Sequence, residues 1–155
     1  MATVERFEDL IIWQLARKFS RDIFELATKE IFKNEFGLIN QIRDSSGSVM
    51  DNIAEGFDRQ SRLEFRQFLS VAKGSLGESK SQIYKAFDRG YIDESIFNKF
   101  VFEIETLSTK INNTIEFLNL TPFISVEFKY SIVLLIFVDK VSISKTNLLN
   151  IDSSI

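Results

Sequence analysis

The residues of this sequence that could do chemistry carry carboxylates, amines, guanidinium groups, hydroxyls or amides, because its 155 residues include no His and no Cys. Without imidazole the chain lacks the commonest general base and metal ligand. Without thiols it has no cysteine nucleophile, disulfide or zinc ribbon. Carboxylates remain, but nothing places two of them as a matched acid and base. Di-iron bundle enzymes also need paired Glu-x-x-His motifs. We therefore expect no catalytic site, metal or cofactor.

The clearest charge pattern is a basic excess over residues 59–89, which carry seven basic and three acidic side chains, whereas residues 90–118 carry two basic and five acidic ones. On a helix, four of the cations fall within a stripe about 40° wide at the edge of the apolar face. Such a stripe predicts contacts with a phosphate backbone. The candidate phosphate-binding residues are Arg59, Arg62, Arg66, Lys73 and Lys80.

Two alternatives compete with that interpretation of the cations. They could form a solvated helix face, or they could pair across a helical hairpin with Asp51, Glu55 and Asp58. The sequence pI of about 5.1 is also far from the basic footprint of most nucleic-acid-binding domains.

A second pattern is a strip of small residues at four-three-four spacing, directed away from the expected core. Glycine inside a helix costs about 1 kcal/mol relative to alanine, so two glycines on one outer face suggest that another helix approaches there. The predicted subunit contact comprises Ser70, Gly74, Gly77 and Ser81. The alternative is simple tolerance of small residues on a surface. A phosphate-cradling loop is excluded, because no Gly-Lys-Ser/Thr motif follows.

A predicted helical hairpin joins the helix that carries these patterns to the helix before it. Ser61 and Glu64 form a capping-box pattern, and Gly56 stands where a left-handed helix-ending residue is expected. Asn52 and Glu55 lie beside the core stripe, and Glu55 could accept a hydrogen bond from Arg59 or from Arg62 across the turn. The competing role for Glu55, a catalytic carboxylate, has no partner group to support it.

Amphipathic spacing places these residues on four long helices with short connections. We predict an all-α, up-down-up-down antiparallel four-helix bundle over residues 1–120, followed by an irregular C-terminal extension over 121–155. The expected helices are Phe7–Ile31, Phe36–Glu55, Ser61–Arg89, and one that begins at the N-cap Asp93 and carries its apolar stripe to Leu118. The expected core face of the third helix is Phe65, Phe68, Leu69, Ala72, Leu76, Ile83 and Phe87.

The extension has a different character. Val126, Phe128 and Tyr130, and the run from Ser131 to Val138, favour strands, although a bundle offers them no sheet. One interpretation is a poorly ordered or loosely packed extension. The other is an apolar segment that meets another subunit or a membrane surface. The run is too short to span a bilayer, and the N-terminus has no secretory signal pattern.

The central stretch resembles a known family. Asn52–Phe57, Ala72–Glu78 and residues between them resemble the four-helix-bundle family named after 23S rRNA intervening sequences, also called S23 ribosomal protein-like. The other matching residues are Trp13, Gln14, Phe36–Leu38, Gln41–Arg43, Arg59, Ser61, Glu64, Phe65, Phe68 and Leu69. The resemblance covers roughly Phe7 to Leu118. Asp44–Gly47 stands where relatives usually have a more basic, alanine-rich segment, and this change removes positive charge. Met50 replaces a common proline.

This resemblance implies a small cytoplasmic bacterial protein that forms homopentameric rings and has no catalytic activity; a related group binds nucleic acid as accessory proteins of reverse transcriptases. The leading hypothesis is thus a non-enzymatic homo-oligomer associated with RNA or DNA through its third helix, and not with a membrane. The alternative is a protein–protein adaptor or regulatory scaffold without nucleic-acid binding. A third class, a small-molecule or metal-binding bundle, lacks ligands.

Overall fold

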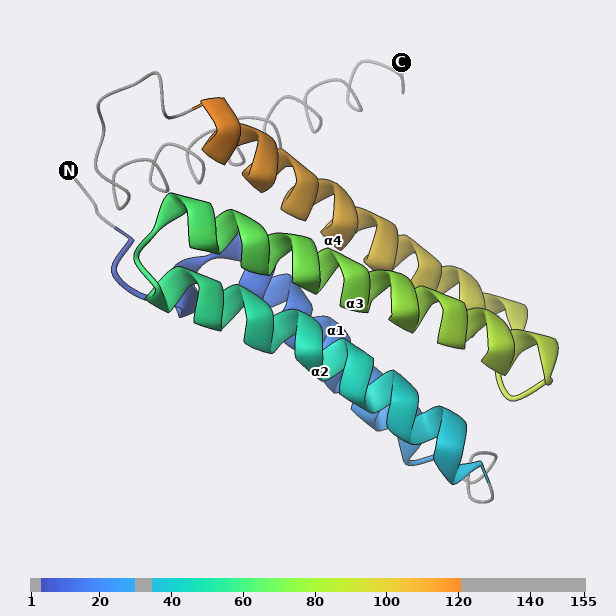
Figure 1. Ribbon diagram of the computed structural model, residues 1–155. Helices are drawn as coiled ribbons and strands as arrows, with labels where there is room; N and C mark the ends of the chain where they lie inside the picture. Colours follow the sequence, from blue (N-terminus) through green and yellow to red (C-terminus); the bar gives the residue numbers. More distant parts are fainter. Residues whose placement is uncertain (1–3, 30–34, 121–155) are drawn as a thin grey trace, which may run out of the picture.

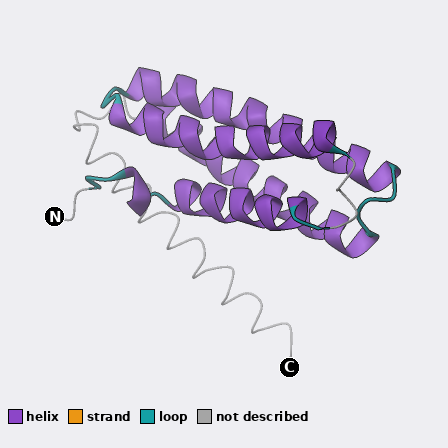
Figure 2. Ribbon diagram, turned by 90° about the horizontal axis from the view of Figure 1, so that it is seen from below, coloured by secondary structure: helices purple, strands orange, loops and turns teal. Residues whose placement is uncertain are grey.

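The chain folds into four long helices that lie side by side (Figure 1). The computed structural model describes residues 4–29 and 35–120. A short 3-10 helix, η1 (Phe7–Asp9), precedes α1 (Ile11–Ala27), α2 (Phe36–Asp58), α3 (Arg62–Asp88) and α4 (Glu94–Leu120). Each helix packs on the one before it, and α1 also packs on α4. Figure 2 shows helices and turns and no strand in the described residues, which confirms the predicted all-α bundle.

All four helices contribute apolar side chains to one core, as their three-four spacing predicts. Fully buried members include Phe19, Ile23, Ile42, Ile53, Phe65, Leu69, Leu76, Ile83, Leu107 and Ile111. Two predicted members of the third helix are not in the core: Phe68 is only half-buried, and 37% of the surface of Phe87 is exposed. Phe87 lies in the last turn of α3, at the end of the bundle, where the first turns of α4 cover only one side of it.

The α2–α3 connection is the tight turn that the sequence predicts. Ser61 precedes α3, and its hydroxyl accepts a hydrogen bond from the Glu64 amide at 3.4 Å, which confirms the helix cap. The left-handed residue of the turn is Gln60, whose φ is 54°. A non-glycine residue at positive φ is uncommon, so the sequence carries little sign of it.

Gly56 does not end α2, contrary to the prediction of a left-handed terminator. The helix continues to Asp58, and Gly56 is buried within it. A Cβ atom at this position would lie 2.5 Å from Cβ of Phe68 on α3, nearer than atoms of two side chains can approach. Glycine is required here because α2 and α3 lie too close together for any side chain.

The α3–α4 connection combines a glycine stop with the acidic start that the sequence predicts. Gly90 adopts a φ of 73° just after α3, where a left-handed residue is favourable. The Oδ1 atom of Asp93 accepts a hydrogen bond from the Ile96 amide at 2.8 Å, which confirms the predicted N-cap.

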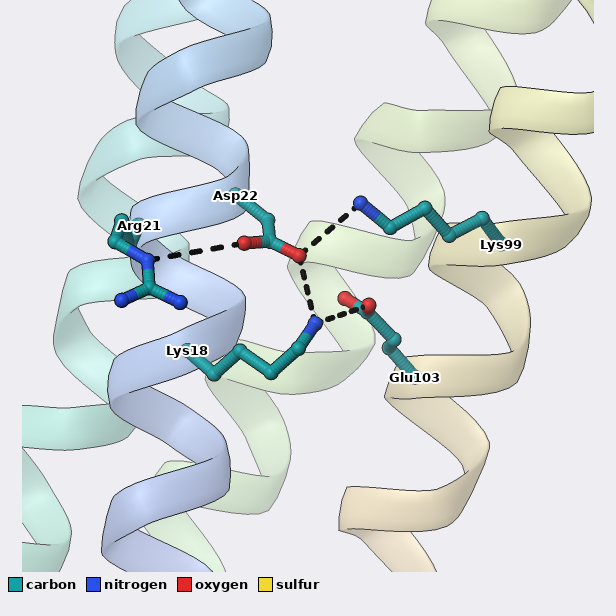
Figure 3. Close-up of polar contacts among 5 residues, drawn as sticks. All are labelled: Lys18, Arg21, Asp22, Lys99 and Glu103. Carbon is teal, nitrogen blue, oxygen red and sulfur yellow. Dashed lines mark hydrogen bonds and ion pairs between the residues drawn. The ribbon is translucent and has the colours of Figure 1, made fainter.

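The α1–α4 seam is bridged by charged side chains (Figure 3). Nζ of Lys18 on α1 lies 2.6 Å from Oε1 of Glu103 on α4 and 2.7 Å from Oδ2 of Asp22. Lys99 of α4 lies 3.1 Å from the same Asp22 oxygen. Beside this network runs a groove of about 270 Å³ with a mainly apolar lining, over which Phe102 is 71% exposed. The seam is closed less tightly than the rest of the bundle.

Three helix ends differ from the prediction by more than one residue. The first helix begins at Ile11 rather than Phe7, because Leu10 is extended and separates η1 from α1. The first helix ends at Ala27 rather than Ile31, because Thr28 and Lys29 form a turn. The second helix is three residues longer, because Gly56 is helical. The predicted extension over residues 121–155, with its strand-like segments, lies outside the described residues.

Candidate nucleic-acid interface

The predicted cations of the third helix form one row along the edge of α3 that faces α4. Arg62, Arg66 and Lys80 are half-buried, as expected for residues at the margin of the core face, and Lys73 is exposed. Because α3 is uninterrupted from Arg62 to Asp88, its 1.5 Å rise per residue places Arg62 and Lys80 about 27 Å apart along the axis. We call this row of Arg62, Arg66, Lys73 and Lys80 the basic stripe.

Two members of the basic stripe contact α4 rather than the acidic residues considered from the sequence. Nη1 of Arg66 donates to Oδ1 of Asn119 at 2.6 Å, and Nζ of Lys80 lies 3.0 Å from Oε1 of Glu105. The Asn119 amide is neutral and leaves the charge of Arg66 uncompensated. Glu105 offsets the charge of Lys80, so the cationic character is greatest toward the start of α3.

The other two members have hydrogen-bonding capacity left over. Lys73 makes no hydrogen bond or ion pair with the described residues. Nη1 of Arg62 is buried and has no acceptor in the described part of the chain. A buried donor without an acceptor costs about 1–3 kcal/mol. Of these two members of the basic stripe, Lys73 is therefore the one that is open to solvent.

Arg59 lies apart from the basic stripe, at the end of α2. Its Nη2 atom donates to Oε1 of Glu55 at 2.7 Å, and its guanidinium carbon lies 5.6 Å from the centre of the Phe68 ring. The hydrogen bond to Glu55 raises the pKa of Arg59. Of the two predicted donors to Glu55, Arg59 is therefore the one that is used.

The remaining hairpin residues have structural contacts. Nδ2 of Asn52 donates to the Ser48 carbonyl at 2.7 Å, one turn earlier in α2. Glu64 is half-buried in the first turn of α3, and its amide, rather than its carboxylate, contacts Ser61. Glu55 is exposed and paired with Arg59. Among the described residues, no three Asp or Glu side chains gather in a group that could hold a metal ion.

The small-residue strip lies on the outer face of α3. All four members, Ser70, Gly74, Gly77 and Ser81, are exposed. A Cβ atom at Gly74 or Gly77 would meet nothing within 4 Å. No helix of the same chain covers this face in the described residues, so the space expected for a second subunit is open. The subunit contact itself stays a prediction.

Close helix approach within the chain uses a different set of small residues, which were not predicted from the sequence. The Oγ atoms of Ser45 on α2 and Ser79 on α3 lie 2.7 Å apart and are buried. Those of Ser48 and Ser75 lie 3.0 Å apart. The signal was present as small residues at three-four spacing on both helices. It was missed because serine is ordinarily taken as a surface residue.

Comparisons with known proteins agree with this fold. The model of the 23S rRNA-intervening sequence protein family matches residues 8–113. The structure is similar to the crystal structure of a protein of unknown function from the S23 ribosomal protein family of Bacteroides thetaiotaomicron, with a TM-score of 0.63. The two sequences are 21% identical, and the match covers 68% of this chain and 98% of that chain. At this identity the likeness shows the fold alone.

A search of curated proteins gave no match. None of the helices within residues 4–29 and 35–120 is both long and apolar enough to cross a membrane.

Proposed function

The chain belongs to the 23S rRNA-intervening sequence protein family, and we propose that it is a non-enzymatic, homo-oligomeric bundle that associates with nucleic acid, in particular RNA. The observation that carries this proposal is the basic stripe. Four cations lie along one uninterrupted helix edge, and one of them, Lys73, is exposed and makes no hydrogen bond or ion pair with the described residues. Phosphates bound along such an edge release counterions, so the affinity should fall steeply with salt.

Charge reversal within the basic stripe tests the proposal. The double variant Arg66→Glu, Lys73→Glu should abolish salt-sensitive binding of a fluorescently labelled RNA, measured by anisotropy at low and high salt. Lys85→Glu is a matched control, because Lys85 is also exposed on α3 but points about 140° away from Arg62 around the helix. Circular dichroism should show that all variants stay helical. Equal binding by the double variant and the wild type would contradict the proposal.

The oligomer is the second part of the proposal, with a homopentamer expected from the family resemblance. Its support is the open small-residue strip and the exposed apolar side chains beside it, Leu63 and Val71. Light scattering on a size-exclusion column measures the mass. Gly77→Leu should reduce that mass to that of a monomer, because a bulky side chain keeps a second helix away. A monomeric wild-type protein would contradict this part alone.

The same exposed apolar side chains support one alternative, a protein–protein adaptor without nucleic-acid binding. Leu63 and Val71 are more than half exposed, and such side chains on an outer helix face suit a protein partner. An oligomer that copurifies with no RNA and does not bind the labelled probe at low salt would favour the adaptor.

A further inference from the structure

An exposed cluster of aromatic rings lies at the α3–α4 end of the bundle. The rings of Tyr84 and Phe97 meet edge to face with their centres 4.9 Å apart, and those of Phe87 and Phe97 stack with centres 4.6 Å apart. Phe97, from the first turn of α4, is half-buried and supports the other two. Tyr84 is nevertheless 46% exposed and Phe87 is 37% exposed. The contacts with Phe97 therefore fix two rings that solvent still reaches.

This cluster continues the basic stripe. Counting from Lys73, the positions 80, 84 and 87 follow at steps of seven, four and three residues, which return to the same side of an α-helix. At 100° per residue, Arg62, Arg66, Lys73, Lys80, Tyr84 and Phe87 all fall within about 60° of arc. One edge of α3 thus carries four cations followed by two aromatic rings.

The order of these groups suits one class of ligand. Cations that follow a backbone, together with aromatic faces on which bases stack, are the features by which proteins bind single-stranded nucleic acid. Bases inside a duplex are already stacked and offer no free face, whereas unpaired bases do. Fixed rings also lose little conformational freedom on binding, since Phe97 already holds them.

We propose that this edge of α3 is a binding site for single-stranded nucleic acid, in which Lys73 and Lys80 contact phosphates and the rings of Tyr84 and Phe87 stack with bases. This inference rests on the proposed function and deepens it, because it specifies an unpaired strand as the ligand. It also gives a role to the exposed ring of Phe87.

Glu105 is the group that opposes phosphate binding at this site. Its carboxylate lies 3.0 Å from the ammonium of Lys80, so a phosphate must compete with it. Replacement by glutamine removes the negative charge and keeps the shape. Glu105→Gln should therefore strengthen binding of a single strand by about threefold or more, a change that loss of folding cannot imitate.

The decisive experiment compares an oligouridine of about twelve nucleotides, a length within the usual range of single-strand sites, with an RNA duplex of the same length. Wild-type protein should bind the single strand at least about tenfold more tightly. Tyr84→Leu, which keeps an apolar contact with Phe97, should weaken that binding about tenfold and leave duplex binding unchanged. Tyr84→Phe should preserve binding, because it keeps the ring.

Phe102→Leu is the matched control. Phe102 is an aromatic residue of α4, 71% exposed, that borders the groove beside α1 instead of the basic stripe. Its loss should leave binding unchanged. Equal weakening in this variant and in Tyr84→Leu would overturn the inference, since it would reveal a general effect of surface aromatic residues.

The remaining outcomes separate this inference from the proposed function. If Arg66→Glu, Lys73→Glu abolishes binding but Tyr84→Leu has no effect, the stacking site is wrong and the proposed function stands. If neither variant alters binding, both are wrong. If Tyr84→Leu changes the oligomer mass but not the affinity for oligouridine, the aromatic cluster is a contact between proteins and the inference falls.

Discussion

The α2–α3 interface and the α1–α4 seam close the same bundle in opposite ways. Between α2 and α3, Gly56 lets Phe68 come into direct contact with the helix backbone, and buried serines face each other at 2.7 Å. Between α1 and α4, long charged side chains reach across an apolar groove. Small residues allow helices to approach closely, whereas lysines cover apolar surface with their stems and keep their charges in water.

The comparison indicates where the chain tolerates change. A closely packed interface has no space for added atoms, so even one methyl group disturbs it. A seam joined by ion pairs whose lysines are about half exposed loses less when one pair is removed. We therefore expect substitutions at the α2–α3 interface to change the free energy of unfolding most and substitutions at the α1–α4 seam to change it less. A substitution in the turn before α3 should change it least.

Gly56→Ala should have the largest effect. Its new Cβ would lie 2.5 Å from Cβ of Phe68, so α2 and α3 must move apart, at a cost of about 2–3 kcal/mol in the free energy of unfolding. Urea denaturation followed by circular dichroism measures it. Gly47→Ala is the control on the same helix: its Cβ meets nothing within 4 Å, so alanine should stabilise by up to about 1 kcal/mol. Equal effects of both changes would contradict the close packing.

Ser79→Val should destabilise next most, by about 2 kcal/mol. Ser79 is fully buried and lies against Ser45, so the two methyl groups of valine overfill a site matched to a hydroxyl. Thr109→Val, an exposed change on α4, should cost less than about 0.5 kcal/mol. The same urea series measures both, and a neutral Ser79→Val would show that the serine contact has room to spare.

Asp22→Asn should cost about 1 kcal/mol near neutral pH. Burial acts to raise the pKa of Asp22, but hydrogen bonds from Lys18 and Lys99 outweigh it and lower the pKa overall. A lowered folded-state pKa means that this contribution is present above the unfolded pKa and is lost as the pH falls through the folded one. The difference in stability between wild type and variant should thus shrink in acid. A difference independent of pH would contradict the ion-pair account.

Gln60→Gly should have the smallest effect, a stabilisation of about 0.5 kcal/mol. Gln60 has a φ of 54° in the turn before α3, which strains a residue with a side chain but not glycine. The gain is limited because glycine also loses more conformational freedom on folding. Thermal unfolding should show a small rise in Tm. A fall in Tm would indicate that the Gln60 side chain stabilises the turn.

The outcome of the sequence predictions follows a physical division. Helix existence and the caps at Ser61 and Asp93 were predictable, because apolar spacing and capping depend on residues near one another in the chain. The roles of Gly56 and Phe87 were assigned wrongly for the opposite reason. Glycine is suitable both for a left-handed helix end and for a close approach between helices, and only the position of Phe68 distinguishes the two.

For the candidate site too, local spacing was predictable and long-range contacts were not. The position of the basic stripe at the margin of the core face was predictable from helical spacing alone. The partners of its members were not, because Asn119 and Glu105 lie more than twenty residues away in the sequence and meet α3 only after α4 packs against it. The continuation of the stripe into Tyr84 and Phe87 was hidden by the assumption that a phenylalanine at core spacing is buried.

The sequence by itself therefore determined the class of the fold, the four helices, the N-caps at Ser61 and Asp93 and the placing of cations along one edge of α3, since these depend on local periodicity and backbone hydrogen bonding. Only the tertiary structure decided which small residues bring helices together, which cations are neutralised and which aromatic rings stay exposed. Those properties depend on distances between residues far apart in the chain, which are set when the helices pack.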